Sequence, residues 1–138
     1  MRKLLDMAIN AAQVAGGECL KHYQQSLVVN YKGDGSPLTV ADQAAHRVIT
    51  DCLARSQIII VSEEGENLHL EAEHYWLVDP LNGTKDFLAG NGEFTVNIAL
   101  IEQSEPLLGV VFAPALGEIP WVVGAWRVRQ SMHVLLSP

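Results

Sequence analysis

The segment WLVDPLNGTKDF, residues 76–87, contains the residue types best suited to chemistry. An apolar run ends at the carboxylate of Asp79, and Asn82-Gly83-Thr84 then turns the chain toward the start of a helix. This arrangement surrounds one point with a carboxylate, a backbone carbonyl and several N–H groups, which a divalent cation and a phosphate require. A strand followed by an ordinary Pro-x-Asn-Gly turn explains the same residues, so this segment alone leaves both interpretations open.

Two further acidic positions occur at the ends of expected elements. Asp42 falls in the first turn of a helix capped by Thr39. Glu63 follows an apolar strand over residues 58–61, with Ser62 between them. Residues at strand ends in layered α/β folds can meet at one site, and Mg²⁺ requires oxygen ligands from separate segments. The three acidic positions predict metal-assisted hydrolysis of a phosphate ester. The structural alternatives are a helix-capping role for Asp42 and a solvated acidic loop at Glu63-Glu64.

Hydrophobic periodicity predicts the elements that must position these residues. Apolar residues at three- and four-residue spacing predict helices over roughly residues 2–25 and from Thr39 to Leu53. Gly16-Gly17 weakens the first helix by about 1 kcal/mol per glycine. Short apolar runs predict strands at 28–31, 58–61, 76–78, 96–101, 107–112 and 119–123, the last three as a meander, with one more strand from Arg127.

Composition narrows the classes of function. The chain has 138 residues, one domain's worth, and its net charge of −7 with no basic patch argues against binding to nucleic acid or anionic membranes. No apolar run approaches the ~18 residues of a membrane span, and the first residues do not form a signal peptide. Cys19 and Cys52 are expected to be buried thiols rather than a disulfide. We expect a cytoplasmic protein, with the inner face of the membrane as the alternative location.

Together these segments resemble the Mg²⁺-dependent inositol monophosphatase superfamily. Its signature, an Asp-Pro-x-Asp-Gly-Thr motif after an earlier glutamate pair, is matched by Asp79-Pro80-Leu81-Asn82-Gly83-Thr84 and Glu63-Glu64. The CysQ-type 3′(2′),5′-bisphosphate nucleotidases match more closely, through SPLTVADQAAHRVI (36–49), VSEEG (61–65) and NGEFTVNIALIE (91–102). The resemblance implies an α/β fold, an α+β layered sandwich with two amino-terminal helices on a largely antiparallel sheet. It also implies hydrolysis of 3′-phosphoadenosine 5′-phosphate, the expected small-molecule partner, to AMP and phosphate.

The resemblance further implies a role for each motif residue. The ligands of two or three Mg²⁺ ions would be Glu63, Asp79, the backbone carbonyl of Leu81, and Asn82. Thr84 and Asp42 would orient and deprotonate the attacking water. Residues expected to contact the substrate are Glu63, Leu81, Asn82, Gly83 and Thr84, with N–H groups around Gly83 and Thr84 holding the phosphate.

Two departures from the family pattern matter. Position 82 is Asn where the family has Asp, so the second metal site lacks one charge. Family members continue into a second domain that supplies another metal-binding aspartate and most nucleoside contacts. We therefore expect residues 1–138 to form the amino-terminal domain without the carboxyl-terminal one, and to self-associate through an exposed sheet face. The alternatives are a catalytically silent domain with only metal-binding or interaction capacity and, third, an inositol monophosphatase, against which NGEFTVNIALIE argues.

Overall fold

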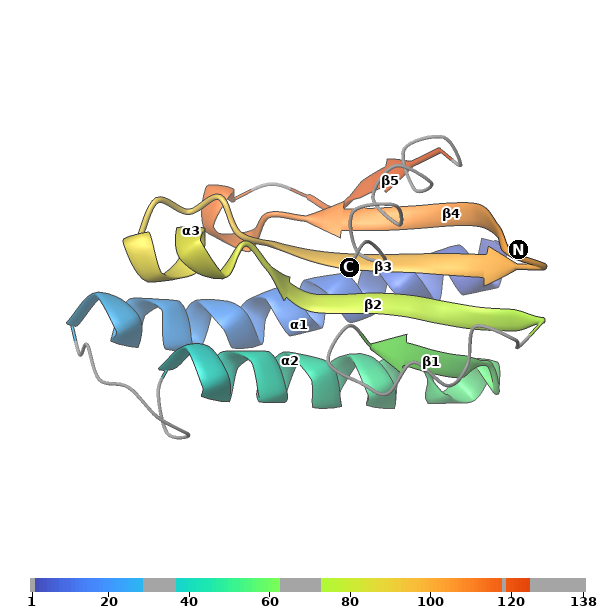
Figure 1. Ribbon diagram of the computed structural model, residues 1–138, viewed down its shortest axis with the longest axis horizontal. Helices are drawn as coiled ribbons and strands as arrows, with labels where there is room; N and C mark the ends of the chain where they lie inside the picture. Colours follow the sequence, from blue (N-terminus) through green and yellow to red (C-terminus); the bar gives the residue numbers. More distant parts are fainter. Residues whose placement is uncertain (1, 29–36, 63–72, 118, 125–138) are drawn as a thin grey trace.

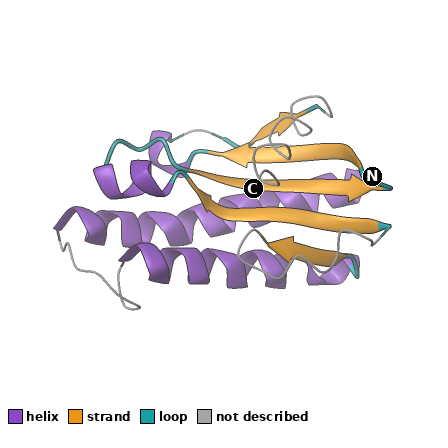
Figure 2. Ribbon diagram, viewed as in Figure 1, coloured by secondary structure: helices purple, strands orange, loops and turns teal. Residues whose placement is uncertain are grey.

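The computed structural model describes residues 2–28, 37–62, 73–117 and 119–124, and packs two long helices against one face of a sheet (Figure 1, Figure 2). Its elements are α1 (Arg2–Val28), α2 (Pro37–Leu53), the 3₁₀ turn η1 (Ala54–Ser56), β1 (Ile59–Ser62), β2 (His74–Asn82), α3 (Thr84–Ala89), β3 (Thr95–Glu102), β4 (Glu105–Phe112), the 3₁₀ turn η2 (Pro114–Leu116) and β5 (Trp121–Val123). The strand order is β1-β2-β3-β4-β5, with only the β1–β2 pair parallel. The expected meander and the expected layered α/β architecture are confirmed.

Small side chains allow the helices to approach each other and the sheet closely. The fully buried residues of this kind are Ala8, Ala11, Ala12, Ala15, Cys19, Ala41 and Ala45. Gly16 belongs to the same surface, since a Cβ built on it would lie 2.4 Å from the ring of Phe112 on β4. Gly16 therefore does more than weaken α1, because its missing side chain makes room for β4.

Several expected boundaries differ from the structure. Val28, expected to begin a strand, is the last residue of α1, and residues 29–31 lie outside the described residues. α2 begins at Pro37 rather than after Thr39, because the fixed φ of proline suits the first helical position. Asp42 consequently lies beyond the first turn of α2, and the capping role considered for it is wrong. The strand expected from Arg127 also lies outside the described residues.

The face of the sheet opposite the helices contains a second, smaller apolar cluster. Trp76 and Val78 join the main core under the helices, so the alternation along β2 directs Tyr75 and Leu77 to the opposite face. There these two side chains pack with Val61 and Ile101, and all four are buried. At these positions the expectation of an exposed apolar face is wrong. Exposed apolar side chains lie instead on β5, where Trp121 is 55% and Val122 53% exposed.

Candidate functional site

β2 does not end at Asp79 as the sequence predicted, but continues to Asn82 through an irregular stretch. Asp79 pairs with Asn97 and Asn82 pairs with Thr95, so β2 has one residue more than β3 between these two pairs. This is a β-bulge, and Pro80 fits it because a bulge does not require every N–H of the ladder. The bulge leaves Asp79 only 3% exposed while Asn82 is exposed.

The turn after the bulge requires glycine. Gly83 has a φ of +95°, and a Cβ there would lie 3.0 Å from Oδ2 of Asp86 and 3.3 Å from Cα of Phe94. Gly83 is the N-cap of α3, and its carbonyl accepts a hydrogen bond of 3.0 Å from the N–H of Phe87. Thr84 is the exposed first residue of α3, so the helix start predicted from Asn82-Gly83-Thr84 is confirmed.

Cys19 on α1 contacts this end of β2. The thiol of Cys19 donates a hydrogen bond of 3.7 Å to the carbonyl oxygen of Pro80. Burial, followed by the charges of Asp42 and Glu18, raises the pKa of this thiol to about 12. The charge of Asp42 therefore acts on a thiol that contacts the carbonyl of Pro80.

The described residues provide part of the expected ligand set. Asp79, the backbone carbonyl of Leu81 and the side-chain amide of Asn82 offer oxygen donors only, which fit Mg²⁺. Glu63 lies outside the described residues. Within the described ranges no three His, Cys, Asp or Glu side chains form a group able to hold a metal. That result does not cover the expected ligand set, because two of its members are a backbone carbonyl and a side-chain amide.

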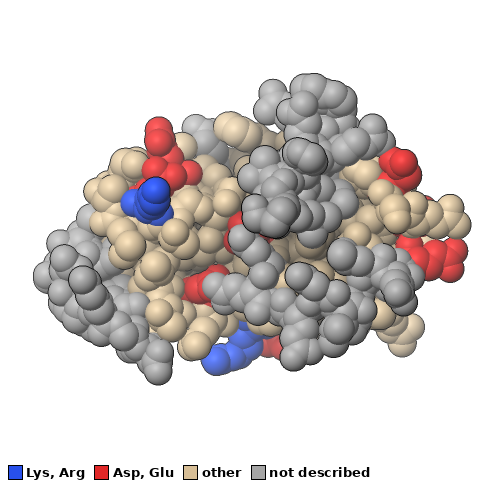
Figure 3. Space-filling model, viewed as in Figure 1, with Lys and Arg blue, Asp and Glu red and all other residues tan. Residues whose placement is uncertain are grey.

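Few basic side chains are visible on the described part of the sheet side of the molecule (Figure 3), in line with the net charge of −7. A phosphate approaching an acidic protein gains from a bound cation that neutralises the site. The negative charge of the chain therefore fits a site that binds a cation through oxygen donors.

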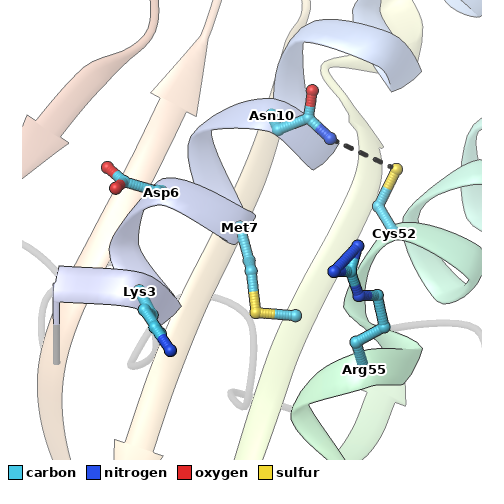
Figure 4. A pocket seen from close by; sticks show the side chains of 6 residues that line it. All are labelled: Lys3, Asp6, Met7, Asn10, Cys52 and Arg55. Carbon is cyan, nitrogen blue, oxygen red and sulfur yellow. Dashed lines mark hydrogen bonds between the residues drawn. The ribbon is translucent and has the colours of Figure 1, made fainter.

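A cavity of about 500 Å³ lies elsewhere, between the beginning of α1 and the end of α2 (Figure 4). Its lining residues are Lys3, Asp6, Met7, Asn10, Cys52 and Arg55. The Asn10 amide contacts the Cys52 thiol there at 3.9 Å. None of the residues predicted for catalysis or metal binding lines this cavity.

Comparison with known proteins identifies the family of the chain. The model of the inositol monophosphatase family matches residues 1–134. The chain belongs to this family. The 3′(2′),5′-bisphosphate nucleotidase CysQ of Salmonella typhimurium is 47% identical over 95% of this chain and 58% of the relative. That of Buchnera aphidicola is 48% identical over 82% of this chain and 45% of the relative.

Solved structures of family members confirm the fold. The crystal structure of CysQ from Bacteroides thetaiotaomicron superimposes with a TM-score of 0.76 at 38% identity, covering 86% of this chain and 44% of that chain. The suppressor protein SuhB of Bartonella henselae gives a TM-score of 0.73 at 29% identity. The chain spans about half the length of the curated relatives it matches, and corresponds to their amino-terminal part. Among the described residues no helix is both long and apolar enough to span a membrane.

Proposed function

We propose that this chain carries the amino-terminal part of a Mg²⁺-dependent phosphomonoesterase that hydrolyses 3′-phosphoadenosine 5′-phosphate to AMP and phosphate. The observation that carries the proposal is the buried carboxylate of Asp79 at a β-bulge, directly before the Gly83-Thr84 turn. The identity of the nucleotide substrate is inferred from the similarity to CysQ nucleotidases.

Each residue contributes a distinct part of the chemistry. Asp79, the Leu81 carbonyl and Asn82, together with Glu63, would hold the cation. When bound, Mg²⁺ neutralises phosphate charge and lowers the pKa of bound water. Water attacks phosphorus while its proton passes through the Thr84 hydroxyl to the carboxylate of Asp42. The bond from phosphorus to the 3′ oxygen breaks, and that oxygen takes a proton from a solvent water molecule as it leaves.

Asn82 limits the proposed activity. An amide oxygen can coordinate Mg²⁺ but contributes no charge, so one cation is held more weakly than by a carboxylate. Phosphate release from 3′-phosphoadenosine 5′-phosphate, measured with and without Mg²⁺, tests the proposal in the wild type and in Asp79→Ala and Asn82→Asp variants. We expect Mg²⁺-dependent release that Asp79→Ala abolishes and Asn82→Asp increases. Release that is unchanged in Asp79→Ala would contradict the proposal. Faster phosphate release from inositol 1-phosphate than from 3′-phosphoadenosine 5′-phosphate would show that the proposed substrate is wrong.

A second candidate function is a catalytically silent domain that retains metal binding. It is favoured by Asn82, whose amide brings no charge to the second metal site. Divalent metal binding at Asp79, combined with no phosphate release from wild type or Asn82→Asp, would select this candidate.

A further inference from the structure

Two side chains of α1 contact the segments on either side of the Asn82–Thr84 turn. Cys19 and Tyr23 are four residues apart and therefore lie one above the other on the same face of the helix. The thiol of Cys19, which is fully buried, donates a hydrogen bond to the carbonyl of Pro80, which precedes the turn. The ring of Tyr23 lies 5.4 Å from that of Phe87, after the turn.

The partners of Tyr23 hold the turn directly. Phe87 donates its N–H to the Gly83 carbonyl, and the Phe94 backbone fills the space that a Gly83 side chain would need. The two phenylalanine rings are 5.1 Å apart, edge to face, and Tyr23 lies 4.9 Å from the Phe94 ring. All three rings are buried, so a shift of Gly83 requires the aromatic cluster to repack.

Pro80 is held from the other side. Its carbonyl belongs to the peptide that leads into Leu81, so the hydrogen bond from Cys19 restricts the orientation of that peptide. The thiol is a donor throughout the neutral range, because its pKa is raised to about 12. A hydrogen bond from a thiol is weak, but here it joins two residues that are both buried.

We propose that Cys19 and Tyr23 are positioning residues that hold the Asp79–Thr84 segment from both ends. Their consequence for metal binding rests on the proposed function, whereas their effect on the segment itself does not. Metal-binding and catalytic sites require their ligand atoms to be held within about 0.5 Å of the productive geometry by the surrounding packing. Helix α1 provides that support from outside the motif.

Two measurements on the same variants test this role. Hydrogen exchange of the Phe87 amide, which donates a hydrogen bond of 3.0 Å to the Gly83 carbonyl, reports local opening of the segment when it is followed by NMR without metal. Titration with Mn²⁺, followed by electron paramagnetic resonance, reports metal affinity. The variants are Tyr23→Leu, Tyr23→Phe, Cys19→Ala and Cys19→Ser. Phe112→Leu is the control, because it alters packing between α1 and β4, a strand that does not pair with β2.

We expect Tyr23→Leu to accelerate exchange in the segment about tenfold or more, since it removes two ring pairs that are each worth roughly 2–13-fold in an equilibrium constant. We also expect it to weaken Mn²⁺ affinity about tenfold, as loss of a supporting contact does at other metal sites. Cys19→Ser should remain near wild type, with Cys19→Ala between it and Tyr23→Leu. Tyr23→Phe keeps both ring pairs and should therefore accelerate exchange less than Tyr23→Leu. Phe112→Leu should change neither quantity in the segment.

Unchanged exchange in both Tyr23→Leu and Cys19→Ala would overturn the proposal. Equal acceleration in Phe112→Leu would also overturn it, because the effect would then be general loss of stability. If the wild-type chain binds no Mn²⁺, the proposed function fails, and the exchange data alone decide whether α1 positions the segment. If Tyr23→Leu does not fold, the comparison of Cys19→Ala with Cys19→Ser decides it.

Discussion

Gly16 and Gly17 are adjacent on α1, yet we expect alanine to have opposite effects at the two positions. A Cβ on Gly16 would lie 2.4 and 2.6 Å from ring atoms of Phe112 and 3.1 Å from Cβ of Pro114. A Cβ on Gly17 would meet nothing within 4 Å. The two substitutions are therefore matched in chemistry and helix propensity and differ only in packing.

The magnitudes follow from these distances. Carbon atoms in contact prefer about 3.5–4.0 Å, so Gly16→Ala forces the Phe112 ring to move. Overpacking of this kind costs about 1–3 kcal/mol, against which alanine gains about 1 kcal/mol over glycine in a helix. We expect Gly16→Ala to lower the free energy of unfolding by about 0–2 kcal/mol. Gly17→Ala should raise it by about 1 kcal/mol.

Urea denaturation followed by circular dichroism measures both variants against the wild type. The difference between the two variants should be about 1–3 kcal/mol, with Gly17→Ala the more stable. Adding Phe112→Leu to Gly16→Ala should recover part of the loss, because the smaller side chain relieves the contact. The reasoning is refuted if Gly16→Ala is as stable as Gly17→Ala, since α1 would then not approach β4 as closely as the structure shows.

Three further predictions concern single side chains. Because the pKa of the Cys19 thiol is raised from 9.0 to about 12, the unfolded thiol ionises first as pH rises between these values. The free energy of unfolding should then fall by at most about 1.4 kcal/mol per pH unit. The fall should be less steep in Cys19→Ala, and parallel pH profiles of the two proteins would contradict this. Asn82-Gly83 should deamidate faster than Asn91-Gly92 at mildly alkaline pH. Both asparagines are exposed, but the Asn91 side chain donates a hydrogen bond to Asp86 and accepts one from the Glu93 N–H, each of 2.9 Å. Peptide mapping of aged protein that finds Asn82 unconverted would oppose that expectation. Ser56→Ala should destabilise the fold by about 1–3 kcal/mol in urea denaturation, because Ser56 accepts a hydrogen bond of 3.0 Å from the buried Trp76 indole. An additional loss of the same size when Ser56→Ala is made in a Trp76→Phe background would show that this hydrogen bond is not the cause.

Local sequence patterns predicted the elements better than their ends. Periodicity located both long helices and the strands of the meander, because each pattern reports burial of one face. The Asn82-Gly83-Thr84 turn was also predictable, since only glycine tolerates the φ that Gly83 adopts. The continuation of β2 past Asp79 was not, because it depends on pairing with Asn97 and Thr95 on β3.

The supports of the candidate site could not be found from local patterns. The contact between Cys19 and Pro80 joins residues 61 positions apart, and nothing in either segment indicates the other. The only available signal was the four-residue spacing of Cys19 and Tyr23 on an apolar helix face, which is equally typical of ordinary core residues.

Metal binding at Asp79 is the central claim, and Mn²⁺ titration followed by electron paramagnetic resonance tests it most directly. The titration compares the wild type with Asp79→Ala and with Asp51→Ala, which removes an exposed carboxylate on α2. We predict that the wild type and Asp51→Ala bind Mn²⁺ alike and that Asp79→Ala loses the site. Equal binding by all three proteins, or no binding by the wild type, would contradict the account.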